Sequence, residues 1–240
     1  MYSPVTHIVS HHDRGAIAEH IERTIRQSVS QAWTPGWPGE IESALLDAIF
    51  SSRAPYGGPD TGVRRVVARW REHRNAAFPD DVVVLDDLTA LAEFADRPED
   101  LADILGNRQR VAGNSTTKAE ATVRAATVLS ALGVRSAAHL VDSEDHRAAV
   151  TAITGIGDKT WECVFFAVGS RTANAVDLLR SFASEAVGRT LDADMTHALL
   201  ESTAEMLGIR YPFLEHAAWR YQRRFGITFS TPAPVGIDGL

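Results

Sequence analysis

Two side chains in the second half of the chain are of types that can do chemistry at a sugar carbon. Lys159 follows a short glycine-containing turn, and Asp177 comes eighteen residues later in a Val-Asp pair. A carboxylate can take a proton and stabilise positive charge that develops on a sugar carbon. A lysine whose pKa is lowered by partial desolvation can form a covalent Schiff base. If the two side chains meet, the pair predicts chemistry at a sugar carbon.

The intervening chain is long enough to bring the two side chains together. A helix of about ten residues after Gly157 would carry the chain roughly 15 Å from Lys159. An extended segment over 169–176 spans more than about 20 Å, which is enough to return. Simpler roles stay open, because Lys159 can be a phosphate contact or a solvated charge. Asp177 can be the N-cap of a helix over 178–188.

The turn before Lys159 has the composition of a hairpin between two helices. Gly155 and Gly157 alternate with the apolar residues Ile153 and Ile156. The two glycines can take backbone angles closed to other residues and let the chain approach a ligand closely. Amides at the start of the next helix, together with its dipole, favour an anion such as a DNA phosphate. The alternative is a plain glycine-rich turn between two helices.

The stretch 153–177 resembles the helix-hairpin-helix, Gly/Pro-Asp superfamily of DNA glycosylases and is similar to endonuclease III in particular. That family has a Gly-apolar-Gly-x-Lys-Thr hairpin, followed at the same interval by a Val-Asp pair that carries the catalytic carboxylate. The matching residues here are Gly155 to Thr160, then Val176 and Asp177. Weaker similarity extends over roughly 40–226 and includes an early helix ending in a wedge loop, the start of the helix before the hairpin, and a late helix, at 45–53, 113–120 and 214–219.

The resemblance implies an all-α, two-lobed helical fold and a base-excision activity on double-stranded DNA that contains a damaged or mismatched base. In the family's reaction the base is extruded into the cleft between the lobes. Asp177 would activate the nucleophile and stabilise the sugar cation. Lys159 would attack C1′ and permit strand nicking, or water would replace it and the reaction would stop at base removal. The alternative is a DNA-binding protein without chemistry.

Further DNA contacts are expected from the hairpin and from two other places. Arg53, in the wedge-like position, would fill the gap left by the extruded base, and Tyr56 would stack on an exposed base. Both residue types are also common in ordinary turns. Lys118 belongs to a basic cluster that suits phosphate. The complete set of predicted DNA-binding residues is Gly155, Ile156, Gly157, Thr160, Arg53, Tyr56 and Lys118.

The sequence departs from endonuclease III at three points. Cys163 is the only cysteine, so the four cysteines of the iron–sulfur cluster are absent. Leu178 and Leu179 follow the aspartate where the family often has Thr-His, and Arg180 then resembles the branch that acts on alkylated bases. Thr154 replaces a usual proline. These departures leave the excised base unassigned.

Apolar residues at helical spacing predict an almost entirely helical chain. We expect helices near 14–30, from Glu40, Thr61 and Asp87, and at 99–105, 116–132, 136–141, 145–153, 158–168, 177–188, 192–207 and 212–224. Ser143 or Asp145 should begin one helix, and Gly133 and Gly188 should end others. The predicted division is an N-terminal helix and linker over 1–39, a glycosylase-like domain over 40–226 and a loose tail over 227–240.

The composition permits a nucleic-acid partner but does not indicate one. The net charge of −7 arises from residues 80–103, where nine carboxylates face Arg97 alone. Local basic density matters more than the total for phosphate binding. A single cysteine, no signal-like N-terminus and no long apolar run predict a cytoplasmic protein. We expect no cofactor and no metal, since one cysteine cannot build a thiolate site and His11 with His12 cannot readily share one ion.

Overall fold

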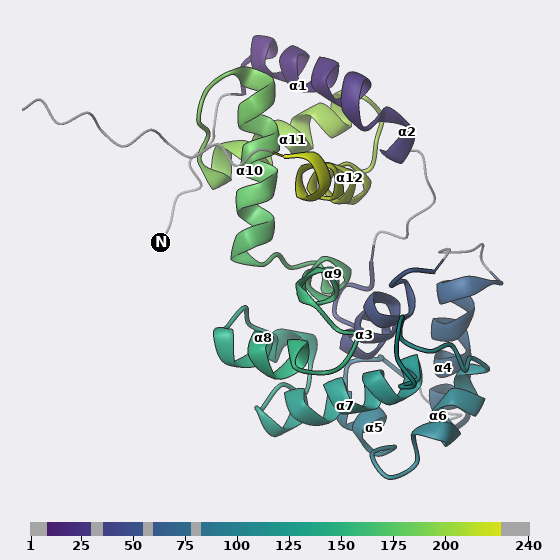
Figure 1. Cartoon of the computed structure of the whole chain (residues 1–240). Helices are drawn as coiled ribbons and strands as arrows, with labels where there is room; N and C mark the ends of the chain where they lie inside the picture. Colours follow the sequence, from purple (N-terminus) through teal and green to yellow (C-terminus); the bar gives the residue numbers. More distant parts are fainter. Residues whose placement is uncertain (1–8, 30–35, 55–59, 78–82, 227–240) are drawn as a thin grey trace, which may run out of the picture. The chain divides into compact units, whose positions relative to one another are not determined.

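A computed structural model describes residues 9–29, 36–54, 60–77 and 83–226. Within these ranges the chain is helical, with no strand beyond an isolated bridge between Arg110 and Thr117, which confirms the all-α prediction. The helices are α1 (His11–Thr24), α2 (Arg26–Val29), α3 (Ile41–Phe50), α4 (Gly62–Ala77), α5 (Leu88–Ala92), α6 (Pro98–Leu105), α7 (Lys118–Ala131), η1 (Ala137–His139), α8 (Glu144–Thr151), α9 (Asp158–Val168), α10 (Ala173–Val187), α11 (Ala193–Met206) and α12 (Tyr211–Phe225) (Figure 1).

Local residues fix several helix ends, as the sequence predicts. The Ser143 side chain caps α8 by accepting a hydrogen bond from the amide of His146 at 3.2 Å. Gly133 and Gly188 follow α7 and α10 with φ of 88° and 70°. Such left-handed angles favour glycine and end a helix.

The chain divides into two compact units. The first combines 1–31 with 173–240, and the second is 32–172. In the first unit α1 packs against α10 and α11, so the N-terminal helix shares a core with the C-terminal helices. The predicted ranges 1–39 and 40–226 follow chain order and do not coincide with these units, while 227–240 lies outside the described residues.

In the second unit, α3 is the central helix. All of its residues are buried, and it packs against α4, α5, α7 and α9 (Figure 1). The buried Glu42 carboxylate accepts hydrogen bonds from Trp70 Nε1 at 2.7 Å and from the amide of Asp87 at 2.9 Å, and Arg74 lies 3.3 Å away. Burial raises the pKa of Glu42, and these partners oppose that shift.

The acidic stretch 80–103 has structural roles in this unit. Asp86 accepts hydrogen bonds from the amides of Ile41 and Ala137, and Asp87 caps α5. Glu99 and Asp103 both pair with Arg108. These four carboxylates therefore hold helix ends and one arginine.

The first unit has its own aromatic core. His20 of α1 is buried and lies edge-on to Phe182 of α10, with ring centroids 4.7 Å apart, and to Tyr221 of α12 at 6.1 Å. Burial lowers the pKa of His20, with a smaller contribution from Arg23 and an opposing one from Glu185. None of the helices in the described ranges combines the length and apolar character needed to cross a membrane.

Candidate nucleic-acid interface

The predicted hairpin is present and lies entirely within the second unit. It joins α8 to α9 through residues 152–157. Turn hydrogen bonds run from the amide of Ile153 to the carbonyl of Val150, at 3.1 Å, and from that of Ile156 to the carbonyl of Ile153, at 3.0 Å. Both isoleucine side chains are buried and anchor the turn in the core.

The two glycines of the hairpin differ in what they require. Gly155 has φ of 87°, and a Cβ placed there would lie 1.7 Å from Val111 Cγ1. Only glycine fits that position. Gly157 has φ of −121° and ψ of −179°, which any residue can adopt, and no atom lies within 4 Å of its would-be Cβ. The expectation of a special backbone angle is therefore confirmed at Gly155 and wrong at Gly157, where the backbone is instead open to solvent.

Backbone amides converge where α9 begins. The amides of Thr160 and Trp161 both donate to the carbonyl of Gly157, at 2.9 and 3.1 Å. Within the described ranges the amides of Gly157, Asp158 and Lys159 have no such acceptor. They occupy the first turn of an eleven-residue helix, whose dipole also favours an anion. The arrangement suits a phosphate oxygen.

One acidic residue stands at this helix start and is neutralised from α8. Arg147 Nε donates a hydrogen bond to Asp158 Oδ1 at 2.9 Å across the hairpin, and a terminal nitrogen of Arg147 forms an ion pair with the same oxygen at 2.9 Å. Arg147 could not be predicted from the sequence, because its partner is eleven residues away and on another helix. The pair leaves the exposed Lys159 as the uncompensated charge of the first turn.

Lys118 corrects a sequence prediction. It is 5% exposed, and its ammonium donates to the carbonyls of Phe50 and Ser52, both at 2.9 Å, and to Gln109 Oε1 at 3.3 Å. Its three donors are thus used inside the protein, and it does not reach a phosphate. Burial lowers the pKa of Lys118.

The lysine instead stabilises the turn that carries Arg53. Phe50 and Ser52 supply carbonyls at the end of α3, which Lys118 satisfies in the way that cations cap helix C-termini. Arg53 is exposed and has φ of 52°, the left-handed region that a residue other than glycine rarely adopts. The turn that Lys118 stabilises therefore presents Arg53, the predicted wedge residue, to solvent.

Ile156 and Thr160 do not offer donors to DNA in the way the sequence predicts. They are only 4% and 7% exposed, so their side chains belong to the core, and their amides already donate to the carbonyls of Ile153 and Gly157. Tyr56 lies outside the described residues.

The candidate catalytic residues lie in different units. Lys159 is in α9 of the second unit, and Asp177 is in α10 of the first, so their proximity stays a prediction. Asp177 is not an N-cap, because α10 begins at Ala173 and the segment linking it to α9 is only 169–172, not the extended 169–176. The Asp177 side chain is 63% exposed, and its Oδ1 lies 3.0 Å from Arg180.

The described residues contain no group of three or more His, Cys, Asp or Glu side chains placed to hold a metal ion. The described residues form an all-α protein with an exposed glycine-containing turn at the start of α9. A family model described as a domain of unknown function, DUF8548, matches residues 15–223, and the chain belongs to that family. No curated protein and no solved structure matches the chain.

Proposed function

We propose that this protein binds double-stranded DNA through the hairpin at 152–157 and excises a damaged or mismatched base. The observation that carries the proposal is the set of acceptor-free amides at Gly157, Asp158 and Lys159, beside an exposed lysine. Such a site holds a phosphate without reading sequence, as a repair enzyme must. The division into two compact units and the Lys159–Asp177 interval add support, because both suit a two-lobed glycosylase.

In the proposed reaction the glycosidic bond breaks and its electron pair leaves with the base, which takes up a proton. Asp177 stabilises the sugar cation and accepts the proton of the nucleophile. With water as nucleophile, the products are free base and an abasic site. With the Lys159 amine as nucleophile, attack at C1′ displaces the base, and the C1′–O4′ bond then opens with its electron pair and a proton on O4′, which gives a Schiff base. Removal of a proton from C2′ then expels the 3′ phosphate by β-elimination and breaks the strand.

A second function has an observation in its favour. Asp177 is solvent-exposed, lies in the second turn of α10 and is paired with Arg180, whereas a catalytic carboxylate is usually partly desolvated. These facts fit a protein that binds DNA through the hairpin and performs no chemistry.

DNA binding is tested with the full chain and a fully paired duplex at increasing salt. Two exposed arginines of the second unit, Arg53 and Arg110, together with Lys159, suggest about three phosphate contacts, for which log K should fall with log salt at a slope near −3. Lys159→Ala should make the slope shallower by about one. No binding at low salt, or an unchanged slope in the variant, would contradict the role of the hairpin.

Excision is tested with a panel of oxidised, alkylated, deaminated and mismatched duplexes. Asp177→Asn should abolish base release with little loss of stability, because an exposed ion pair contributes about 0–1 kcal/mol. Asp194→Asn, which removes the same charge from an exposed helix start in the same unit, is the matched control. Base release that survives Asp177→Asn excludes the proposed chemistry, and no release from any substrate favours the binding function.

Borohydride trapping decides whether Lys159 is the nucleophile. Lys159→Arg keeps the positive charge for a phosphate but cannot form a Schiff base. A covalent adduct in the wild type that disappears in this variant supports strand nicking through Lys159. An adduct that persists assigns the nucleophile elsewhere.

A further inference from the structure

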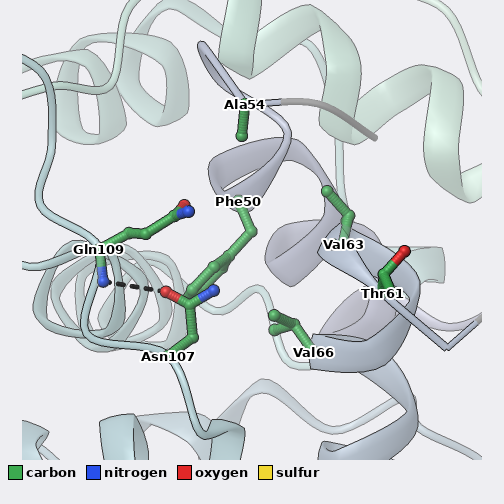
Figure 2. Close-up of a pocket in the computed structure, with 8 residues that line it drawn as sticks. Phe50, Ala54, Thr61, Val63, Val66, Asn107 and Gln109 are labelled. Carbon is green, nitrogen blue, oxygen red and sulfur yellow. Dashed lines mark hydrogen bonds between the residues drawn. The ribbon is translucent and has the colours of Figure 1, made fainter. Parts of the chain in front are cut away.

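The second unit contains a cavity that the hairpin does not explain. Its volume is about 250 Å³, and it lies between the end of α3, the start of α4 and the segment that follows α6. Figure 2 shows Phe50 at its centre, with valines on one side and two amide side chains on the other. The main lining residues are Phe50, Ala54, Val63, Val66, Asn107 and Gln109.

The hydrogen bonds of the two amides fix their orientation. Asn107 Oδ1 accepts from the amide of Gln109 at 2.9 Å, and Gln109 Oε1 accepts from the Lys118 ammonium at 3.3 Å. An oxygen must face each of these donors, so each side chain keeps its NH₂ group for another partner. In Figure 2 the Asn107 nitrogen is turned toward Val66, and the Gln109 side chain extends toward Phe50. The cavity therefore has an apolar, aromatic interior and two hydrogen-bond donors.

This chemistry matches one flat heterocycle with two acceptors on one edge. The volume is below the roughly 300–1,000 Å³ of sites for drug-sized ligands, so a single ring system fits it. Among the purines, guanine presents N7 and O6 as adjacent acceptors, whereas adenine presents an amino donor beside N7. An unpaired cytosine also presents two adjacent acceptors, O2 and N3, but on a single six-membered ring. Phe50 can stack on such a ring, as aromatic side chains do on unpaired bases.

The segment that lines the cavity also contacts the hairpin. Gln109 lines the cavity, and Val111, two residues later, is the residue that leaves no room for a Cβ at Gly155. Ala54 at the cavity follows the exposed Arg53. DNA held by the hairpin would therefore pass near a cavity that can accept one of its bases.

We propose that this cavity binds a guanine unstacked from the DNA, with Asn107 and Gln109 donating to its N7 and O6. The inference rests on the proposed DNA binding but not on excision. It adds a base preference that belongs to the second unit alone, independent of Asp177.

The test uses fluorescence anisotropy with the full chain and duplexes that carry one unpaired nucleotide. Unpaired guanine and hypoxanthine, which both have N7 and O6, should bind more tightly than unpaired adenine. The expected ratio is roughly two- to tenfold for each hydrogen bond. Unpaired 7-deazaguanine, which lacks N7, should lose about one such factor.

Isosteric variants remove the donors while keeping the internal hydrogen bonds. Asn107→Asp still accepts from the Gln109 amide, and Gln109→Glu still accepts from Lys118, but neither has an NH₂ group. Both should lose the preference for guanine over adenine. Asn114→Asp is the control, because Asn114 is exposed in the same segment, its Oδ1 accepts from Thr116, and it does not line the cavity. The control should keep the preference.

The outcomes separate this inference from the proposed function. If the wild type binds paired duplex but shows no guanine preference, or if both variants keep it, the cavity assignment is wrong and DNA binding stands. If no duplex binds, both are wrong as stated. Free guanosine that binds without DNA, and that needs Asn107 and Gln109, would identify a nucleoside site and overturn the assignment to DNA.

Discussion

The two hairpin glycines permit a direct test of the structure, because the same substitution should lower the free energy of unfolding at one position and leave it nearly unchanged at the other. Gly155→Ala places a methyl group 1.7 Å from Val111 Cγ1 at φ of 87°. Gly157→Ala places it in open space at φ of −121°. The first should destabilise the second unit, and the second should leave its stability nearly unchanged while weakening DNA binding.

The expected magnitude at Gly155 has two contributions. A left-handed angle in a residue with a Cβ costs about 1–2 kcal/mol, and an overpacked methyl group costs about 1–3 kcal/mol more. The free energy of unfolding should therefore fall by roughly 2–5 kcal/mol, which is a large part of the total for a typical domain. At Gly157 the change should stay below about 1 kcal/mol, because the backbone is already in an extended conformation that alanine adopts.

Urea unfolding of the two variants, and of Gly155→Ala combined with Val111→Ala, measures these contributions. Removing the valine methyls should recover the packing cost but not the backbone cost, so the double-mutant cycle should show a coupling of about 1–3 kcal/mol. DNA affinity of the Gly157→Ala variant is measured in parallel. A Gly155→Ala variant as stable as the wild type would refute the described packing of Val111 on the hairpin. Undiminished DNA affinity in Gly157→Ala would refute close approach of a phosphate to its amide.

Three further outcomes follow from single side chains. Lys118→Met should lower the free energy of unfolding by about 1–3 kcal/mol in urea titrations, because two buried carbonyls lose their donor. Burial lowers the pKa of His20, so the unfolded chain takes up a proton at a higher pH than the folded chain does. The free energy of unfolding should therefore fall as pH drops through about 6.5. His20→Phe should remove this pH dependence in denaturation curves recorded from pH 8 to 5. Arg147→Met should leave stability within about 1 kcal/mol but weaken duplex binding in anisotropy titrations, because Asp158 would then face the phosphate without its partner.

Features that depend on neighbouring residues could be predicted from the sequence. The hairpin could be predicted from Ile153, Gly155 and Ile156. The two isoleucines are buried, and Gly155 between them has the backbone angle that only glycine adopts readily. The N-cap of α8 at Ser143 and the end of α7 at Gly133 could be predicted for the same reason, since capping involves residues within one helical turn.

Features set by distant contacts could not be predicted. Lys118 resembles any lysine at the start of a helix, and its burial depends on Phe50, which lies 68 residues earlier in the chain. The close fit of Val111 on Gly155 spans more than forty residues. The grouping of α1 with α10 and α11 likewise arises from packing across the length of the chain.

The predicted start of α10 is wrong, although the residues that determine it are local. Val176-Asp177 suggested a helix start, yet the helix begins at Ala173. No proline or glycine interrupts the chain between 171 and 187, and Ala173 and Ala175 are of the residue type with the highest helix propensity. Propensity therefore extends the helix by a full turn before the aspartate, and it shortens the link to α9 to 169–172.

The net charge of −7 is compatible with the proposed DNA binding, because backbone amides would supplement a small number of cationic side chains. Amides at Gly157, Asp158 and Lys159 contribute partial positive charge that no count of side chains includes. Within the acidic stretch 80–103, Asp87 caps α5, and Glu99 and Asp103 pair with Arg108. Part of the acidic excess and part of the basic excess therefore stabilise the second unit, and the cationic side chains that face DNA in the proposal are few, namely Arg53, Arg110 and Lys159. A protein with this arrangement should bind duplex with a modest dependence on salt and should owe its selectivity to base contacts rather than to charge.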